Sequence, residues 1–297
     1  MRQRILVTGG KGQLASCIHA IADQYPNLNF IFVDRTIMDI SNDQHVSEFF
    51  GKNKIDWCIN CAAYTTVDKA ESEDDIANEV NVLGPKNLAK SCKEHDVKLV
   101  HISTDFVFNG EKNRAYTEND ATGPLNTYGK TKLQGEQEVI SVLDQHFIIR
   151  TSWLYSEFGH NFMRTMLKLS KEKEQLQIVN DQIGTPTYAG DLATFIVQLI
   201  ATSSREFGLY NYSNEGVASW YDFAKAIFDM SKIDIKVNPI ASDNFPTAAN
   251  RPTFSVLDNA KIKQTFNSEP KYWRESLEVC LQNLKDDHYN LNPKNQV

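Results

Sequence analysis

Short apolar runs alternate with longer amphipathic segments along the first half of the chain. Five runs have the length expected of buried strands, at residues 5–7, 30–33, 55–60, 99–103 and 147–150. Between them, apolar residues recur at helical spacing over residues 13–24, 46–52, 76–95 and 128–142. This alternation is typical of βαβ units. We therefore predict an α/β fold built on a Rossmann-type, doubly wound parallel sheet.

The alternation weakens past residue 155, where Asn, Ser, Pro and aromatic residues become more frequent. We predict helices there at residues 163–173, 190–201, 220–230 and 271–285, and strands at 176–179 and 209–212. The helix at 190–201 is expected to return to the first sheet, so the two predicted domains are interleaved. The first spans residues 1–154 with a return segment at about 186–215, and a smaller α/β domain takes up most of residues 155–297. The last ten residues are expected to fray.

Composition narrows the classes of protein to which the chain can belong. Of its 297 residues, 41% are hydrophobic, which is enough for a buried core. The 31 Lys and Arg residues against 38 Asp and Glu residues leave a net charge of -7 and no basic stretch, which argues against a nucleic-acid partner. No run approaches the roughly 18 apolar residues of a membrane span, and the first apolar run stops at Gly9. We therefore expect a cytoplasmic protein without membrane contact.

Five cysteines in a chain without a signal peptide indicate reduced thiols. Cys58 and Cys61 have C-x-x-C spacing but lie in a predicted strand. Three residues of strand span about 10 Å and turn the two side chains to opposite faces. We therefore predict two buried core thiols rather than a disulfide.

The first predicted strand runs directly into a glycine-rich turn, TGGKGQLA at residues 8–15, that opens a helix. Glycines such as Gly9 and Gly12 let the backbone approach a pyrophosphate, and the free N–H groups of the first helical turn favour its charge. Asp34 ends the second strand 22 residues after Gly12, where a carboxylate that binds an adenosine ribose is expected. We therefore predict dinucleotide binding by the first domain and substrate binding by the smaller one.

Asp34 and its neighbour Arg35 favour different cofactors. Arg35 suits the 2′-phosphate of NADPH, whereas Asp34 suits the free 2′-hydroxyl of NADH. Both NADPH and NADH therefore stay open as the cofactor.

Tyr128 and Lys132 lie one turn apart on a predicted helix and share a face. An ammonium beside a phenol lowers the pKa of the phenol, which can then pass a proton to a carbonyl oxygen as a hydride reaches the carbon. Lys132 can also hold the cofactor ribose. Thr104 supplies a hydroxyl at the sheet edge where ligands of α/β proteins bind. Ser103 is its rival, since period-two alternation lets only one of the two face the site.

Several segments together resemble the extended short-chain dehydrogenase/reductase family over nearly the whole chain. In addition to the glycine turn, the matching segments are NCAAYTTVDKAE at residues 60–71, STDFVF at 103–108, PLNTYGKTK at 124–132, RTSWLY at 150–155, NDQIGTPT at 180–187 and RP at 251–252. The resemblance implies that Thr104, Tyr128 and Lys132 are catalytic, and that Thr104, Asp105 and Trp153 contact a sugar. It also implies a cofactor site formed by Gly12, Gln13, Leu14, Asp34, Asp39, Ile40, Ala62, Ala63 and Thr65.

Two residues of the expected substrate site have a second interpretation. Trp153 either packs on the sugar or thymine of a nucleotide sugar or fills the core beside the sheet. Arg251 either offers its guanidinium to a diphosphate, whose geometry it matches, or lies on the surface. We expect both side chains in the substrate site.

Residue 106 separates the reactions found within this family. Dehydratases have a glutamate there, and Phe106 cannot remove a proton. Relatives that epimerise and then reduce have a poised cysteine, and the chain has none between Cys92 and Cys280. The resemblance thus implies reduction of dTDP-4-dehydro-L-rhamnose to dTDP-L-rhamnose, with a hydride from NAD(P)H to C4 and a proton from Tyr128. Two alternatives stay open: reduction of another dTDP-4-keto-deoxysugar, and a non-catalytic NADP-binding regulatory subunit like that of methionine adenosyltransferase.

Two positions depart from the family pattern. Ile102 stands where relatives often have an aromatic residue near the cofactor. Cys17 stands where relatives that dimerise through Mg²⁺ have a glutamate, so no metal site is expected. A monomer and a homodimer both stay open.

Overall fold

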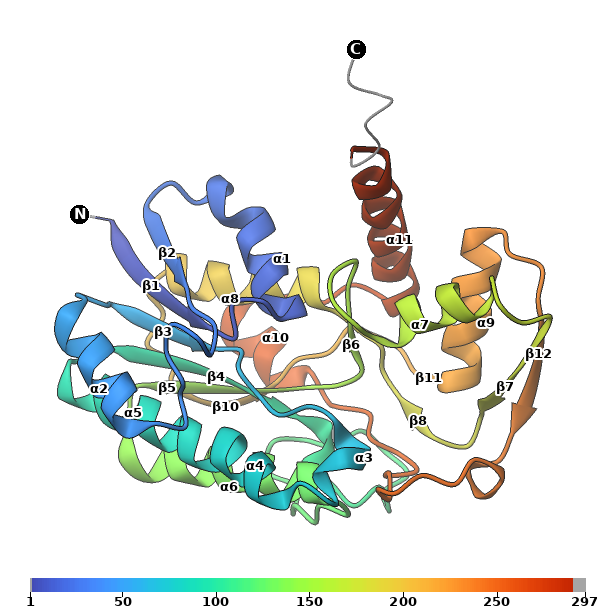
Figure 1. Ribbon diagram of the computed structural model, residues 1–297, viewed down its shortest axis with the longest axis horizontal. Coiled ribbons are helices and arrows are strands. Elements are labelled where there is room, and N and C mark those ends of the chain that lie inside the picture. Colours follow the sequence, from blue (N-terminus) through green and yellow to red (C-terminus); the bar gives the residue numbers. More distant parts are fainter. Residues whose placement is uncertain (1, 291–297) are drawn as a thin grey trace.

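Six parallel strands form the central sheet of the protein (Figure 1). The computed structural model describes residues 2–290, and the side chains of residues 2–284. In spatial order the strands are β10 (Gly208–Asn211), β5 (His146–Thr151), β4 (Lys98–Thr104), β3 (Trp57–Asn60), β1 (Gln3–Thr8) and β2 (Leu28–Phe32). Every neighbouring pair in this sheet is parallel, which confirms the predicted Rossmann-type, doubly wound α/β fold.

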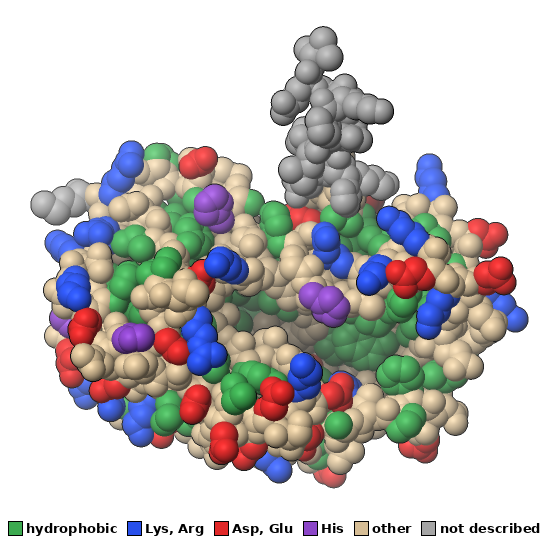
Figure 2. Space-filling model, in the orientation of Figure 1, with side chains coloured by type: hydrophobic (Ala, Val, Ile, Leu, Met, Phe, Trp, Pro, Cys, Tyr) green, Lys and Arg blue, Asp and Glu red, His purple; other side chains and the backbone are tan. Residues whose placement is uncertain are grey.

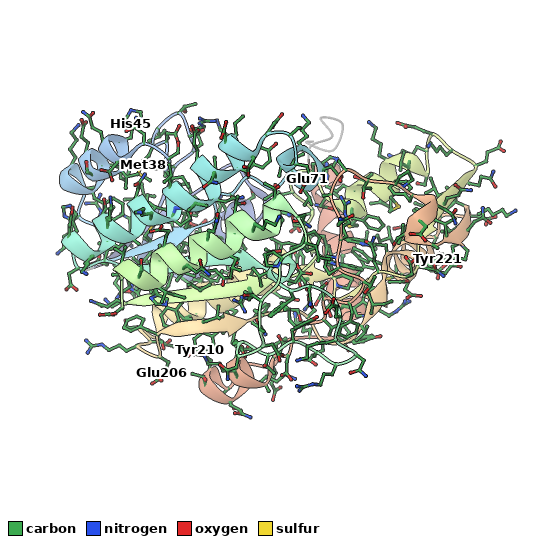
Figure 3. The ribbon with its side chains drawn as sticks, turned by 90° about the horizontal axis from the view of Figure 1, so that it is seen from below. Met38, His45, Glu71, Glu206, Tyr210 and Tyr221 are labelled. Atoms are coloured by element: carbon green, nitrogen blue, oxygen red, sulfur yellow. The ribbon has the colours of Figure 1, made fainter. Side chains whose placement is uncertain are left out.

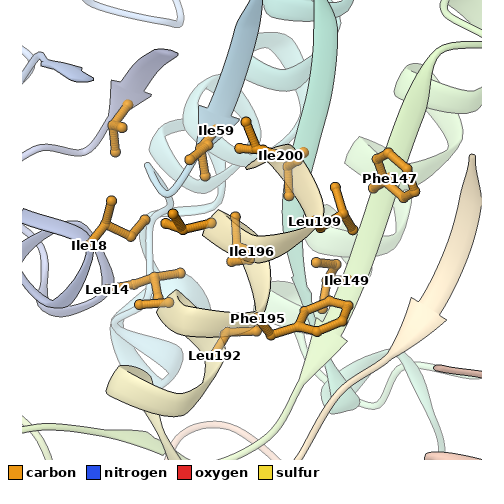
Figure 4. Close-up of a cluster of buried hydrophobic side chains, with 14 of the residues drawn as sticks. Leu14, Ile18, Ile59, Phe147, Ile149, Leu192, Phe195, Ile196, Leu199 and Ile200 are labelled. Atoms are coloured by element: carbon orange, nitrogen blue, oxygen red, sulfur yellow. The ribbon is translucent and has the colours of Figure 1, made fainter. Parts of the chain in front are cut away.

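Helices cover both faces of the sheet, as crossovers between parallel strands require. On one face α1 (Gln13–Ile21) packs against α8 (Ala189–Ala201), and on the other face α5 (Gly84–Glu94) packs between α2 (Asp43–Lys52) and α6 (Thr127–Val142). Figure 4 shows the first face, where Ile18, Ile59 and Ile196 belong to one buried cluster. The predicted helix at 190–201 therefore does return to the first sheet.

The edge strand β10 is covered by side chains from neighbouring elements. Tyr210 packs against Phe266 of α10 (Ala260–Phe266), with ring centres 5.1 Å apart. The Tyr210 hydroxyl donates a hydrogen bond of 2.7 Å to the carbonyl of Glu206, and both residues are labelled in Figure 3. Covering an edge in this way limits pairing with strands of other chains.

Two predicted helices differ from the observed ones. The helix predicted at 76–95 consists of α4 (Asp74–Asn78), a π-helical turn (Glu79–Leu83) and α5. Pro85 has no N–H to donate to the carbonyl of residue 81, which is consistent with an irregular ladder at this point. The helix predicted at 163–173 ends early, because α7 spans Phe162–Leu169 and its buried positions stop at Met166. The polar residues that follow form a turn.

The smaller region contains α7, α9 (Trp220–Ser231) and α11 (Trp273–Asn290) (Figure 1). Its strand pairs are β6 (Leu154–Tyr155) with β9 (Thr187–Tyr188), β7 (Gln175–Val179) with β12 (Lys236–Ile240), and β8 (Ile183–Gly184) with β11 (Ala218–Ser219). Tyr155, Phe223 and Trp273 are part of its own core. The domain boundary near residue 154 stays a prediction. Of the last ten residues, those up to Asn290 are helical, and the rest lie outside the described residues.

The order of strands reverses between β1 and β3, because β2 lies on one side of β1 and β3 on the other. The carboxyl ends of the strands at such a point are where open α/β sheets bind ligands. Cys58 is buried inside β3 as predicted, whereas Cys61 follows the end of the strand and is only partly buried. Both thiols are free as predicted and Cys61 packs against the core, but the prediction of full burial is wrong for Cys61. Among the described helices, none combines the length and apolar character that crossing a bilayer needs.

Candidate active site

A cavity of about 600 Å³ opens beside the carboxyl ends of the strands. Figure 2 shows the surface hollowed between the sheet-bearing part and the smaller region, with hydrophobic side chains on part of the wall. The wall contains residues from the glycine turn, the segment after β3, the end of β4, the start of α6 and the loop after β5. The predicted site residues that line it are Gly12, Gln13, Leu14, Ala63, Thr65, Thr104, Asp105, Tyr128, Lys132, Trp153 and Arg251.

The glycine turn has the geometry of an anion-binding turn. Gly9 has a φ of +65°, and a Cβ there would come within 2.8 Å of the backbone nitrogen of Ala62, so a side chain is excluded. Helix α1 follows Gly12 without a side-chain cap and without an acid in its first turn. Its first N–H groups are therefore free to bind a negatively charged ligand. The predicted cofactor residues that do not line the cavity are Gly9, Asp34, Arg35, Asp39, Ile40 and Ala62.

The end of β2 carries two ion pairs. Asp34 pairs with Lys11 of the glycine turn and accepts hydrogen bonds from the backbone nitrogen and Oγ1 of Thr36, at 2.9 and 2.6 Å. Lys11 and Thr36 together hold the pKa of Asp34 well below its usual range. Arg35 is directed to Asp39 instead, with Nε 2.9 Å from Oδ2. Sequence reasoning missed Lys11, although its place in the turn opposite Asp34 was a usable signal.

Helix α6 carries Tyr128 to the end of β4. The side chain of Asn126 caps the helix by accepting a hydrogen bond from the nitrogen of Gly129 at 2.8 Å. A Cβ at Gly129 would overlap the carbonyl oxygen of Phe106, so glycine is required for this close approach. The ring of Phe106, which was not predicted to contact other site residues, lies edge-on to Tyr128 with centres 5.9 Å apart.

Ser103 and Thr104 direct their hydroxyls to different places, as strand alternation predicts. Thr104 Oγ1 lies beside Tyr128, donates to Asp105 at 3.1 Å and accepts from the nitrogen of Phe106 at 3.2 Å. Ser103 Oγ donates to Glu136 at 2.5 Å instead. Thr104 is therefore the hydroxyl that faces Tyr128.

Burial governs the acidity of Tyr128 and Lys132. It raises the pKa of Tyr128 to about 12, although a hydrogen bond with Thr104 acts in the opposite direction. It lowers the pKa of Lys132 to about 8, although the carboxylate of Glu136 acts in the opposite direction. The expectation of a depressed phenol pKa is wrong for the free protein, because desolvation raises the pKa and the nearby carboxylate of Asp105 raises it further. The phenol is thus protonated at neutral pH, which is the form that a proton donor needs.

Two buried polar atoms on the cavity wall have no hydrogen-bond partner among the described residues. They are Oδ2 of Asp105 and Oγ1 of Thr151. Burial also raises the pKa of Asp105 to about 7. Asp105 and Thr151 thus contribute to the cavity wall, while these two oxygen atoms themselves are buried.

Two tryptophans form an aromatic wall of the cavity. Trp153 stacks on Trp220 with ring centres 3.6 Å apart and planes 6° apart. Trp153 has a φ of +45°, which is unusual for a residue other than glycine. Its ring is partly exposed at the cavity, so it is not a core plug. Sequence reasoning missed Trp220, because nothing in its local pattern separates it from a core aromatic residue.

Arg251 is held at the cavity by a carboxylate from a helix far away in the sequence. Its Nη1 and Nη2 lie 3.1 and 2.7 Å from the two carboxylate oxygens of Asp68 in α3 (Val67–Ala70). The backbone nitrogen of Ala249 also donates a hydrogen bond of 3.1 Å to the Asp68 carboxylate. Glu71 accepts a hydrogen bond of 2.7 Å from the nitrogen of Thr127 and is labelled at this junction in Figure 3. Arg251 is therefore a fixed cation at the cavity.

The two departures from the family pattern lie in different places. Ile102 lines the cavity, whereas Cys17 is buried in α1. Within the part of the chain that the structure describes, no cluster of three or more His, Cys, Asp or Glu side chains could hold a metal ion.

Comparisons with known proteins agree with this geometry. Residues 3–286 match the family model described as the RmlD substrate binding domain. The dTDP-4-dehydrorhamnose reductase of Aggregatibacter actinomycetemcomitans is 39% identical over 92% of this chain and 97% of that protein. The dTDP-4-keto-6-deoxy-D-glucose reductase of Streptomyces niveus is 34% identical over 97% of this chain and 99% of that protein. The crystal structure of dTDP-4-dehydrorhamnose reductase from Bacillus anthracis in complex with NADP has a TM-score of 0.92 at 37% identity, covering 95% of this chain and 100% of that chain.

Proposed function

The chain belongs to the dTDP-4-dehydrorhamnose reductase family, and we propose that it reduces dTDP-4-dehydro-L-rhamnose to dTDP-L-rhamnose with NADPH or NADH. Proteins of this family are NAD(P)-dependent reductases of dTDP-sugars. One observation carries the proposal: a half-buried, protonated phenol, a lysine and a strand-end hydroxyl line the same cavity as a phosphate-binding turn. A cytoplasmic location, the absence of nucleic-acid and membrane partners, and the choice between monomer and homodimer stay predictions.

The residues present fit a nicotinamide dinucleotide. The space at Gly9 excludes a Cβ, and the first N–H groups of α1 are free to hold a pyrophosphate. We assign the adenosine end to Asp34 and Arg35 together with Lys11. The remaining cofactor residues are those already predicted: Gly9, Gly12, Gln13, Leu14, Asp39, Ile40, Ala62, Ala63, Thr65, Tyr128 and Lys132. When bound, the reduced cofactor supplies the hydride.

Tyr128 moves the proton in the proposed reaction. Its Oη donates the proton to the C4 oxygen of the sugar as the carbonyl becomes an alcohol. Thr104 Oγ1 orients that oxygen beside the phenol. Lys132 holds a positive charge near the phenolate that remains, and this charge lowers the cost of deprotonating a phenol whose pKa burial has raised.

The rest of the cavity wall suits a nucleotide sugar. Asp105 and Thr151 line the cavity and are proposed to lie beside the hexose. Trp153 and its stacked partner Trp220 offer an apolar surface to the sugar or the thymine. The guanidinium of Arg251, already fixed by an ion pair, is proposed to bind the diphosphate.

Replacement of Tyr128 tests the proposal. With dTDP-4-dehydro-L-rhamnose and NADPH, the absorbance of the reduced cofactor follows turnover. Tyr128→Phe is expected to lower kcat by about 10² to 10⁴-fold, because general acid catalysis contributes about that much. Its Kd for NADPH, measured by fluorescence, is expected to stay close to that of the wild type. Near-normal turnover by the variant would show that Tyr128 is not the proton donor.

A second candidate is reduction of another dTDP-4-keto-deoxysugar, which the similarity to the Streptomyces niveus enzyme favours. It keeps the same chemistry and changes only the sugar contacts. A wild-type protein that oxidises no NADPH with any such sugar, and that copurifies with a larger enzyme, would instead favour the regulatory subunit.

A further inference from the structure

Glu136 is a buried carboxylate one helical turn beyond Lys132 on α6, and only 1% of its surface is exposed. Its Oε1 accepts hydrogen bonds from Ser103 Oγ at 2.5 Å and Arg150 Nε at 2.9 Å, and its Oε2 accepts one from Arg150 Nη2 at 2.7 Å. Ser103 follows Ile102, whose carbonyl accepts the hydrogen bond from Lys132 Nζ at 2.6 Å. One side chain thus ties α6 to β4 and β5 behind the cavity.

Lys132 is buried as deeply, at 2% exposure, and its own hydrogen bond goes to a neutral carbonyl. The ionisable groups that face it from neighbouring elements are Cys61 after β3 and His101 on β4. Burial raises the pKa of the Cys61 thiol and lowers the pKa of His101, so both are neutral near pH 7. Tyr128, on the same helix, is protonated. The negative charge that favours the buried ammonium is therefore that of Glu136.

Arg150 is the cation that pairs with Glu136. It reaches Glu136 from β5, with its guanidinium 5.1 Å from the ring centre of Phe108. Lys132 and Glu136, by contrast, are four residues apart on one helix, where side chains are neighbours. The carboxylate raises the pKa of Lys132 against the larger influence of burial.

We propose that Glu136 is a positioning residue, whose buried charge keeps Lys132 protonated and whose hydrogen bonds hold the end of β4 against α6. This role rests on the proposed reductase function, in which Lys132 acts as a cation beside Tyr128. Glu136 touches neither substrate nor cofactor and acts through Lys132.

The test is the titration of Lys132 in the free protein, followed by NMR of lysines labelled with ¹³C at Cε. A Lys132→Met variant identifies the resonance. In Glu136→Gln we expect the pKa of Lys132 to fall by about one to two pH units, from Coulomb's law for neighbours on one helix at an effective dielectric constant of about 20. The alkaline limb of the kcat/KM profile should then move to lower pH by a similar amount, since loss of the ammonium occurs earlier.

Glu138→Gln is the matched control, because Glu138 lies on the same helix but pairs with Lys86 nearer the surface. It should leave the titration of Lys132 unchanged. Glu136→Gln leaves Arg150 buried without its partner, so unfolding is a risk. If it does not fold, the double variant Glu136→Leu, Arg150→Met removes both charges, and the pKa of Lys132 should still fall, by a smaller amount, because Glu136 is the nearer neighbour on the helix. An unchanged pKa of Lys132 in the variant that folds would overturn the proposed role of Glu136. A wild-type protein without reductase activity would instead overturn the proposed function, while the titration of Lys132 would still test the role of Glu136.

Discussion

Among single residues, Tyr128 shows most clearly what its spacing in the sequence can and cannot predict. The spacing of Tyr128 and Lys132 correctly predicted that they share one helix face at one cavity. It could not predict the phenol pKa of about 12, because burial arises from distant segments and not from spacing. In the same way, the sequence placed Asp34 and Arg35 at the end of β2 but could not show that each already has an ionic partner.

Lys11 leads to a prediction about cofactor choice. It pairs with Asp34 as Arg35 pairs with Asp39, so the two cations and two carboxylates at the end of β2 balance one another. Lys11→Ala is expected to weaken NADPH binding relative to NADH by about five- to tenfold, because the 2′-phosphate loses a nearby cation and the Asp34 carboxylate is no longer neutralised. Fluorescence titration with each cofactor measures the two Kd values.

The control for this prediction is Lys52→Ala, which removes an exposed lysine paired with Glu48 on α2. It should leave the ratio of the two Kd values unchanged. Because the interaction is near the surface, the difference between cofactors should also shrink as ionic strength rises. An unchanged ratio in Lys11→Ala would show that Lys11 plays no part in cofactor choice.

At the scale of elements, the site depends on how closely α6 approaches the end of β4. Gly129 allows this approach, because a Cβ would overlap the carbonyl oxygen of Phe106. The sequence predicted the bounds of α6 to within one residue, and Gly129 follows Tyr128 directly in the sequence. The reason for the glycine became clear only when the 3₁₀ turn at Asp105–Val107 was seen to pack against the helix.

A pair of glycine substitutions tests this packing. Gly129→Ala is expected to lower the free energy of unfolding by about 1 to 3 kcal/mol through overpacking. Because Tyr128 would move with the helix, kcat should fall at least about tenfold. Gly51→Ala, in α2 with no atom within 4 Å of the added Cβ, should instead stabilise the protein by about 0.5 to 1 kcal/mol and leave kcat unchanged. Thermal unfolding and steady-state kinetics measure both effects, and equal behaviour of the two variants would refute the packing argument.

Strands were easier to predict than the ends of helices. Each predicted strand of the central sheet is present, because continuous apolar runs are required of strands buried on both faces. The π-helical turn before α5 and the early end of α7 were missed, since both depend on contacts with other segments. Cys61 was misplaced for a related reason: the strand ends at Asn60, and the chain then turns toward the cavity.

At the scale of the whole molecule, the cavity is completed by contacts between segments far apart in the sequence. Gln13 Nε2 donates to the carbonyl of Leu154 at 3.2 Å, and Arg251 pairs with Asp68 at 2.7 Å. These contacts connect the glycine turn and α3 with the smaller region. Local patterns placed Gln13 and Arg251 in the site, but neither partner could be predicted, because such pairing is set by the tertiary fold.

The most direct test of the account follows the hydride into the sugar. The protein is incubated with dTDP-4-dehydro-L-rhamnose and NADPH that carries deuterium at the transferable position of the nicotinamide, and the product is analysed by NMR. The account predicts dTDP-L-rhamnose with deuterium at C4. Deuterium absent from C4, or a product that is the C4 epimer of dTDP-L-rhamnose, would contradict it.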